Sequence, residues 1–146
     1  MVLAFEFVAT LSTTLFCGAA IYINLVEHPA RMGCDTKTAA MVWAPSYRRA
    51  TVMQATLAIL GFVGGTAVWW TSGHTSWLAG AALIGAVVPF TFLVIMPTNQ
   101  KLLESGRDLA SSETRMLLEK WAKLHAVRSA LSLLASIVYV GSLVAA

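Results

Sequence analysis

Four long apolar stretches dominate the pattern of hydrophobic and polar positions along the chain. They cover residues 3–26, 51–70, 77–96 and 126–146. Each reaches the ~20 residues that an α-helix needs to cross ~30 Å of hydrocarbon. The pattern therefore predicts an all-α integral membrane protein in which four spans pack as a four-helix bundle.

Two of these spans carry a stripe of polar or small residues at helical spacing. Along the first span the stripe consists of Glu6, Thr10, Thr13, Cys17, Ala20, Asn24 and His28. Along the fourth span it consists of Trp121, His125, Arg128, Ser132, Ser136 and Tyr139. Steps of three and four residues place each set on one helix face. Because polar groups are costly in contact with lipid, we expect both stripes to face the interior of the bundle.

Several residues predict where the helices begin and end. Pro29 predicts the end of the first span, because the residue before a proline is disfavoured in the α conformation. Pro45 is expected near the start of the second span. Ser111 or Ser112 is suited to N-cap the fourth helix, with Glu113 in its first turn. A helix from there to the C-terminus is longer than a bilayer is thick, so we expect its first turns to extend into the cytoplasm.

Length and composition agree with a single membrane domain that covers residues 1–146. The chain has 146 residues, of which 58% are hydrophobic and only 12% are charged. In soluble proteins about a quarter of the residues are charged. A chain of this length forms one domain by size.

The positive charges indicate the orientation in the membrane. All ten Lys and Arg residues lie between the first and second spans, or between the third and fourth spans and just inside the fourth. They are Arg31, Lys37, Arg48, Arg49, Lys101, Arg107, Arg115, Lys120, Lys123 and Arg128. Positive loops mark the cytoplasmic side. We therefore expect long cytoplasmic loops and both termini on the outer side, in a bacterial plasma membrane. The net charge of +3 then reflects topology and anionic lipid, with no nucleic acid as a partner.

Polar residues at the ends of all four spans are expected to meet at the cytoplasmic mouth of the bundle. Because neighbouring spans are antiparallel, these ends lie at one membrane depth. The residues concerned are Glu27, His28, Tyr47, Arg48, Gln54, Asn99, His125 and Arg128, with Trp43 and Trp121 on their cytoplasmic side. Convergent polar groups with aromatic walls are the usual form of a small-molecule site.

A structural interpretation of this polar layer is also open. Arg and Lys near helix ends extend into the headgroups, and Trp and Tyr form interface belts. Arg128 lies inside the fourth span and calls for a carboxylate partner, for which Glu27 is the obvious candidate. On this interpretation the chain is a non-enzymatic membrane subunit or a small-molecule-binding protein whose polar layer locks the helices together.

A metal site is a further alternative. The candidate ligands are Glu27, His28 and His125, because two histidines and a carboxylate resemble the facial triad of non-haem iron. However, Glu27 and His28 are adjacent and diverge by about 100° around a helix, so they rarely share one ion. We therefore prefer a site that needs no cofactor and keep a metal-dependent membrane oxidoreductase as an alternative.

The segment from Gly61 to Gly65 contains a GxxxG motif in the second span. Small residues at this spacing let two helices approach closely. The motif predicts helix packing within the monomer, and it is also compatible with a homo-oligomer.

Four short motifs resemble the DUF1772 family of small four-helix membrane proteins, which includes the anthrone oxygenases. They are EHPAR after the first span, W-x-P-x-Y-R-R-A leading into MQ, MPTNQ-x-L after the third span, and W-x-x-L-H-x-V-R at the fourth. The resemblance covers nearly the whole chain. It implies that Asn99, Trp121, His125 and Arg128 belong to the shared core of the site.

The resemblance implies an oxygenation chemistry for this site, with a lipophilic aromatic or quinone-like molecule and O2 as substrates. An anthrone has an acidic methylene, and its carbanion can react with O2 without a cofactor. Such a site needs a general base with a pKa near neutrality, for which His125 or His28 is suited. Arg128 and Asn99 could stabilise the developing oxyanion. The residues expected to bind the substrate are Glu27, Trp43, Tyr47, Gln54 and Trp121.

Overall fold

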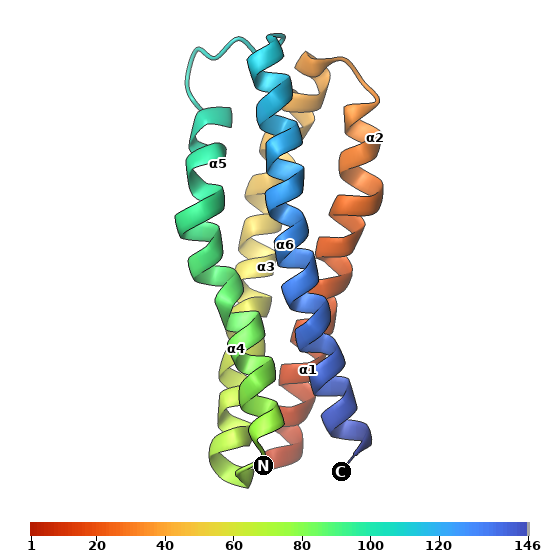
Figure 1. Cartoon of the computed structure of the whole chain (residues 1–146), viewed down its shortest axis with the longest axis vertical. Helices are drawn as coiled ribbons and strands as arrows, with labels where there is room; N and C mark the ends of the chain where they lie inside the picture. The colour runs from red at the N-terminus through yellow and green to blue at the C-terminus, as the bar shows by residue number, and fades with distance from the viewer. Residues whose placement is uncertain (146) are drawn as a thin grey trace.

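The computed structural model describes residues 1–145 and contains four long helical segments (Figure 1). The first segment runs through α1 (Val2–Tyr22), the π turn η1 (Ile23–Glu27) and α2 (His28–Met32). The second is α3 (Thr36–Ser72). The third runs through α4 (Thr75–Phe90), the π turn η2 (Thr91–Ile95) and α5 (Met96–Leu102). The fourth is α6 (Ser112–Val144). Each of the four is long and apolar enough to cross a membrane, which confirms the predicted all-α membrane bundle.

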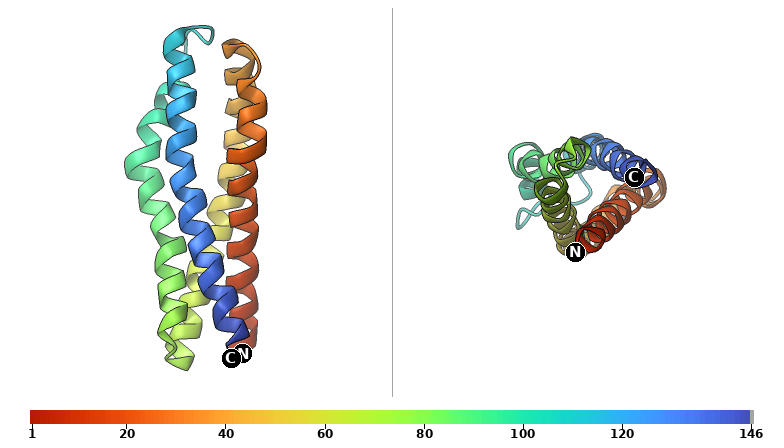
Figure 2. Two further views of the ribbon diagram at one scale, coloured as in Figure 1. Left: turned by 45° about the vertical axis from the view of Figure 1, so that its right-hand side comes forward. Right: turned by 90° about the horizontal axis from the view of Figure 1, so that it is seen from below.

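The four segments surround one central core. Seen from below, α1, α3, α4 and α6 form a closed ring in which each helix packs against two antiparallel neighbours (Figure 2). The two polar stripes face this core, because none of their members is exposed and Thr13, Ser132 and Tyr139 are completely buried. The prediction of two inward-facing stripes is therefore confirmed.

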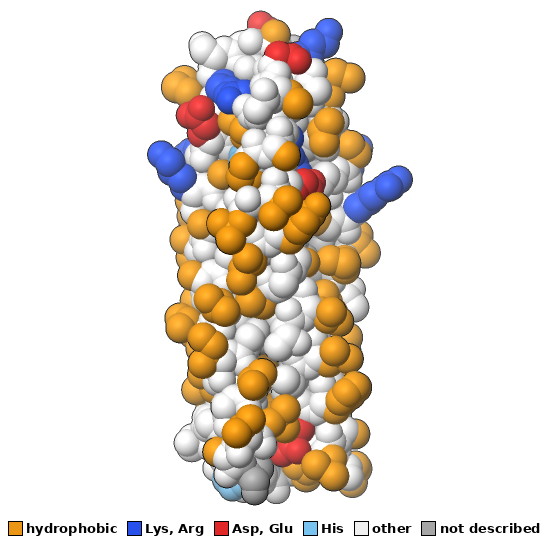
Figure 3. All heavy atoms as spheres, turned by 90° about the vertical axis from the view of Figure 1, so that its right-hand side faces the viewer, with side chains coloured by type: hydrophobic (Ala, Val, Ile, Leu, Met, Phe, Trp, Pro, Cys, Tyr) orange, Lys and Arg blue, Asp and Glu red, His pale blue; other side chains and the backbone are white. Residues whose placement is uncertain are grey.

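Charge separates the two ends of the bundle. Both termini lie at one end, and the connection from α2 to α3 and the connection from α5 to α6 lie at the other (Figure 1). Lys and Arg side chains gather toward this second end, whereas hydrophobic side chains are spread along the rest of the face that Figure 3 shows. We call this second end, which carries the α2–α3 and α5–α6 connections, the basic end. That the basic end is cytoplasmic stays a prediction, based on the positive-inside rule.

The predicted end of the first span at Pro29 is wrong. The helix continues through Pro29 to Met32, and α3 contains Pro45 in its interior, so that only residues 33–35 separate the first two segments. In the π turn before Pro29 the hydrogen bonds span five residues, as the bond from His28 N–H to Ile23 O shows. The turn therefore does not depend on the i→i−4 backbone hydrogen bond of an α-helix, which the proline nitrogen cannot donate. The first of the two predicted long loops is consequently helical almost throughout.

The third segment repeats this arrangement. Its π turn η2 precedes Pro97 by the same number of residues by which η1 precedes Pro29, and both segments share the sequence L-V-x-x-P. Each proline is followed two residues later by a buried polar side chain, Arg31 in one segment and Asn99 in the other. Two corresponding π turns thus shape the basic end of the bundle.

Side-chain caps begin the two helices that follow the connections. Asp35 Oδ1 accepts a hydrogen bond from Thr38 N at 3.0 Å, and the Thr38 hydroxyl donates to Asp35 Oδ2. These hydrogen bonds hold the pKa of the Asp35 carboxyl below its usual range. Ser111 Oγ accepts from Thr114 N at 3.2 Å at the start of α6. The predicted N-cap of the fourth helix is therefore confirmed, with Ser111 as the cap.

The GxxxG motif packs inside the monomer near the end that carries the termini. Tyr139 of α6 extends between α3 and α4, where its hydroxyl donates to Gly61 O at 3.0 Å. Its ring stacks on Trp77, with the ring centroids 5.0 Å apart. A Cβ added at Gly65 would lie 1.8 Å from Tyr139 Oη, and one added at Gly80 would lie 2.3 Å from Tyr139 Cε1. The small residues are therefore used to admit this tyrosine.

We expect Gly65→Ala to destabilise the bundle by about 1–3 kcal/mol, the usual cost of overpacking a core. Tyr139 cannot move aside without losing both its hydrogen bond and its stack on Trp77. Gly18→Ala is a matched control, because Gly18 is also helical but has nothing within 4 Å of the added Cβ. Detergent unfolding followed by circular dichroism measures both variants. Equal stability of the two would contradict the prediction.

A buried polar site at the basic end

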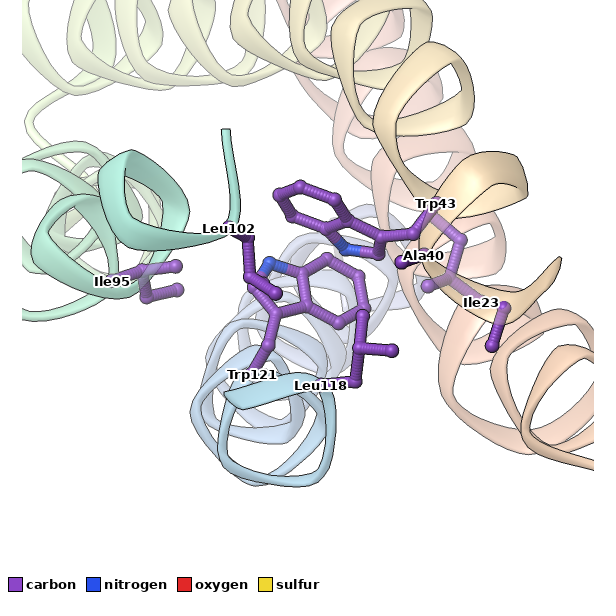
Figure 4. Packing of buried hydrophobic residues seen from close by; sticks show 8 residues of the cluster. Ile23, Ala40, Trp43, Ile95, Leu102, Leu118 and Trp121 are labelled. Atoms are coloured by element: carbon purple, nitrogen blue, oxygen red, sulfur yellow. The ribbon is translucent and has the colours of Figure 1, made fainter. Parts of the chain in front are cut away.

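Two tryptophans form the centre of the core at the basic end. Trp43 of α3 and Trp121 of α6 pack edge to face, with centroids 5.7 Å apart, among Ile23, Leu118 and other apolar side chains (Figure 4). Tyr47, one turn after Trp43, stacks on its ring at 5.0 Å. These aromatic side chains close the bundle at this end and wall the polar groups that lie deeper.

His125 is the most completely buried titratable side chain of α6 at this site. It is 1% exposed, and its ring lies against Trp121 with the centroids 4.8 Å apart. Its Nδ1 lies 2.7 Å from Asn24 Oδ1, which comes from the π turn η1. His28 packs against the same indole at 5.2 Å. Both predicted base candidates therefore contact Trp121, although they come from different segments.

Arg128 is a buried cation whose partner is an amide. Its Nη2 donates to Gln54 Oε1 of α3 at 2.8 Å, and its guanidinium lies 5.4 Å from the centre of the Phe16 ring. Within residues 1–145 Arg128 forms no ion pair. The predicted ion pair of Arg128 with Glu27 is therefore wrong, and among the described residues the guanidinium lies against the Gln54 amide and the Phe16 ring.

Glu27 pairs instead with Arg31, one turn further along the same segment. Ser46 of α3 donates its hydroxyl to Glu27 Oε1 at 2.6 Å. We call these three residues the clasp, because they join the first segment to α3. The continued helix explains the exchange of partners. Because the helix does not end at Pro29, Glu27 and Arg31 lie one helical turn apart on the same face, which is a favoured spacing for an ion pair.

Asn99 of α5 supports the site from the third segment. It is 1% exposed, and its Nδ2 donates to the Tyr47 hydroxyl at 3.0 Å. Its Oδ1 has no hydrogen-bond partner among the described residues. Asn99 thus places an acceptor of its own close to the tyrosine that stacks on Trp43.

A small cavity lies at the meeting point of these groups. Its lining residues are Ile23, Arg31, Ser46, Tyr47, Ala50, Thr51, Gln54, Trp121, His125 and Arg128. The enclosed space measures about 10 Å³, enough for about one water molecule. A wider groove of about 380 Å³ runs along the outside, between the first segment and α3, and it also reaches Arg31. The clasp lies between the groove and the cavity.

Hydrogen-bond donors are in excess around this cavity. Buried N–H groups without a partner among the described residues are Arg31 Nε, Trp43 Nε1, Gln54 Nε2, Trp121 Nε1 and Arg128 Nε. They outnumber the unpartnered acceptors there, which are Asn99 Oδ1 and a ring nitrogen of His28. Buried polar groups in folded proteins normally have partners. A ligand that presents acceptor oxygens, such as a carbonyl or a phenolate, would satisfy such donors.

The nine residues predicted for the site lie together, in two layers. Five of them line the cavity, namely Tyr47, Gln54, Trp121, His125 and Arg128. The other four, Glu27, His28, Trp43 and Asn99, contact these or the cavity-lining Arg31 and Ser46 from behind. Arg48 is exposed and lies outside the site, as expected for an arginine that extends into the headgroups.

Sequence reasoning missed three members of the site, Arg31, Ser46 and Ser129, the last of which donates its hydroxyl to Asn24 Oδ1 beside His125. Arg31 would have been found from its spacing to Glu27 if the helix had been continued through Pro29. Asn24 belonged to the predicted polar stripe, but nothing in the sequence pointed to His125 as its partner. Ser46 carries no pattern that distinguishes it from a surface serine.

The three metal candidates do not come together as a ligand set. Glu27 is bound to Arg31 and Ser46, whereas His28 and His125 pack against Trp121. Among residues 1–145 no group of three or more His, Cys, Asp or Glu side chains could hold a metal ion. The arrangement of these three side chains thus does not fit the facial triad that the residue types suggested, and a site that needs no cofactor stays a prediction.

Fold and site together define a small four-span membrane protein with a buried, donor-rich pocket near one membrane surface. The sequence model of the anthrone oxygenase family matches residues 43–138. The chain therefore belongs to the anthrone oxygenase family, as the short motifs predicted. The matched region contains all five cavity-lining residues that were predicted for the site.

Three curated fungal proteins illustrate the similarity. An anthrone oxygenase of Claviceps purpurea (strain 20.1) is 28% identical over 145 residues. The match covers 89% of this chain and 83% of that protein. The anthrone oxygenase ptaC of Pestalotiopsis fici (strain W106-1) is 35% identical over 113 residues, covering 66% and 79%. The anthrone oxygenase tpcL of Aspergillus fumigatus (strain Af293) is 46% identical over 55 residues, covering 36% and 34%. No solved structure matches the chain. Because these relatives are fungal, they do not support the expected bacterial plasma membrane.

Proposed function

We propose that the protein is a membrane oxygenase that converts an acidic methylene of a lipophilic aromatic molecule, of the anthrone type, into a carbonyl with O2. The observation that carries the proposal is the excess of buried donors around Arg128, whose charge has no carboxylate partner within residues 1–145. Such a site stabilises negative charge on oxygen and has little affinity for a cation. Membership of the anthrone oxygenase family supports the same chemistry.

In the proposed reaction His125 removes a proton from the substrate methylene. The electron pair of the broken C–H bond is delocalised onto the ring carbonyl, and the resulting oxyanion is stabilised by Arg128 and the Gln54 amide. This electron-rich carbanion transfers an electron to O2, and the two radicals combine to form a C–O bond and a peroxide. His125 returns its proton to the peroxide, and loss of the second methylene hydrogen with cleavage of the O–O bond then leaves a carbonyl and releases water. The sum is one substrate and one O2 to one ketone and one H2O.

The size of the cavity implies that the site opens when the substrate binds. A space for about one water molecule cannot admit a polycycle between Tyr47 and Trp121 unless their side chains move. The groove between the first segment and α3 opens on the outside of the bundle and is lined mainly by apolar residues such as Tyr22, Val26 and Val42. A substrate dissolved in the membrane would enter from this groove by displacing the clasp.

A non-enzymatic role is the second candidate function. Polar contacts cross between segments at this depth, including Arg128 with Gln54 and Asn24 with Ala122. Contacts of this kind could lock the four helices together without any reaction. The two candidate functions differ in what substitutions at the site would change, turnover in one case and stability in the other.

Oxygen uptake with a simple anthrone tests the proposal directly. Protein purified in mild detergent and returned to lipid vesicles should consume one O2 for each quinone formed, at a rate far above anthrone autoxidation in empty vesicles. Elemental analysis of the same sample tests the metal-dependent alternative, because near-stoichiometric metal that is absent from His125→Ala would make the site a metal centre. Uptake no faster than autoxidation would refute the oxygenase.

A further inference from the structure

Asn24 makes three hydrogen bonds to α6, and all of them converge around His125. Its Nδ2 donates to Ala122 O at 3.0 Å. Its Oδ1 lies 2.6 Å from Ser129 Oγ and 2.7 Å from His125 Nδ1. Asn24 belongs to the π turn η1, a feature that often occurs at functional sites. One amide from the first segment therefore contacts three successive turns of α6.

The Ala122 carbonyl determines which way the amide points. A backbone carbonyl can only accept, so the amide atom 3.0 Å from it must be the nitrogen. The reversed amide would place two acceptors against each other. The oxygen of Asn24 consequently faces His125 and Ser129, and both of these side chains must donate to it.

We propose that Asn24 is a positioning residue that holds His125 in the Nδ1–H tautomer and so leaves Nε2 unprotonated. In a neutral imidazole one nitrogen carries the proton and the other carries a lone pair, and the hydrogen bond at one nitrogen decides which. Because Asn24 Oδ1 accepts from Nδ1, the lone pair belongs to Nε2. This nitrogen forms no hydrogen bond within residues 1–145, and His125 lines the cavity.

The hydrogen bond to Ala122 O keeps this arrangement from reversing. The Ser129 hydroxyl donates to the same oxygen as His125, and the bond to Ala122 prevents the amide from rotating. An amide also differs from a carboxylate in this position, because it orients the imidazole without adding a negative charge that would stabilise imidazolium. The base is therefore kept neutral and oriented beside the cation Arg128.

The inference rests on the proposed function only where it makes Nε2 the base. The tautomer itself is a property of the resting protein and can be read without any turnover. Solid-state NMR of protein labelled with ¹⁵N,¹³C-histidine in lipid bilayers distinguishes protonated from unprotonated ring nitrogens. With only three histidines in the chain, the signals that vanish in His125→Gln are those of His125.

We expect wild-type His125 to show a protonated Nδ1 and an unprotonated Nε2. In Asn24→Leu the Nε2–H form should appear and kcat for oxygen uptake should fall at least about tenfold, a usual effect of losing a residue that orients a functional histidine. Ser129→Ala is the matched control for the spectrum, because it removes one hydrogen bond to the same oxygen and leaves the tautomer unchanged.

An Nε2–H tautomer or an imidazolium in the wild-type protein would overturn the inference, and so would an unchanged tautomer in Asn24→Leu. The wild-type spectrum tests the predicted tautomer of His125 even if Asn24→Leu fails to fold. The expected tautomer in a protein without anthrone-dependent oxygen uptake would refute the proposed function and leave the role of Asn24 intact.

Discussion

His125→Gln lowers kcat for anthrone-dependent oxygen uptake by about 10²–10⁴-fold, the usual contribution of a positioned general base. Glutamine has nearly the volume of histidine, so the packing against Trp121 is largely kept. Its amide cannot take up the substrate proton, and the carbanion that must react with O2 does not form. The measurement is the initial rate of oxygen consumption in lipid vesicles, at a substrate concentration that saturates the wild-type protein.

His74→Gln is the matched control for this substitution. His74 is an exposed residue before the first turn of α4, at the opposite end of the bundle from His125. Its replacement should leave both turnover and unfolding unchanged. If His125→Gln instead retained turnover but unfolded at a lower detergent concentration, the residue would be part of a structural lock and the assignment of a base would be wrong.

Arg128→Met is expected to lower kcat by about 10²–10³-fold, as the removal of an oxyanion donor does in other enzymes. The effect should be mainly on kcat, since the guanidinium interacts most strongly with charge that develops during the reaction. Arg128→Lys should recover part of the rate, because the charge remains and only the planar arrangement of donors is lost. Arg49→Gln is the control, because it removes an exposed arginine of α3 that is outside the cavity.

The stability of Arg128→Met gives an independent result. A buried charge without an ionic partner is costly to desolvate, and apolar residues of similar volume often replace such charges with no loss of stability. We therefore expect the unfolding free energy to fall by no more than about 1 kcal/mol, the cost of leaving Gln54 Oε1 without its donor. A loss of several kcal/mol with unchanged turnover in the folded fraction would favour the structural role.

Much of the site was predictable because polar residues inside a membrane are rare and costly. A histidine and an arginine on the inner face of the fourth span had to lie near polar groups from other spans, and the antiparallel order of the spans indicated which ones. This reasoning placed Gln54, Asn99 and His125 in one layer without any coordinates. The pairings within the layer were not predictable in the same way, as Arg128 shows.

The sequence by itself determined the four apolar spans, the two inward stripes, the cap of α6 and the common level of the polar layer near one end of the bundle. These features depend on the periodicity and composition of single segments, so that no other segment has to be known. The tertiary structure alone decided which partners the polar groups take. The π turn η1 carries the first helix past Pro29, which brings Arg31 to Glu27 and leaves Arg128 to Gln54. Because such contacts join residues as distant in the sequence as Asn24 and His125, they depend on how whole helices are shifted and rotated against each other.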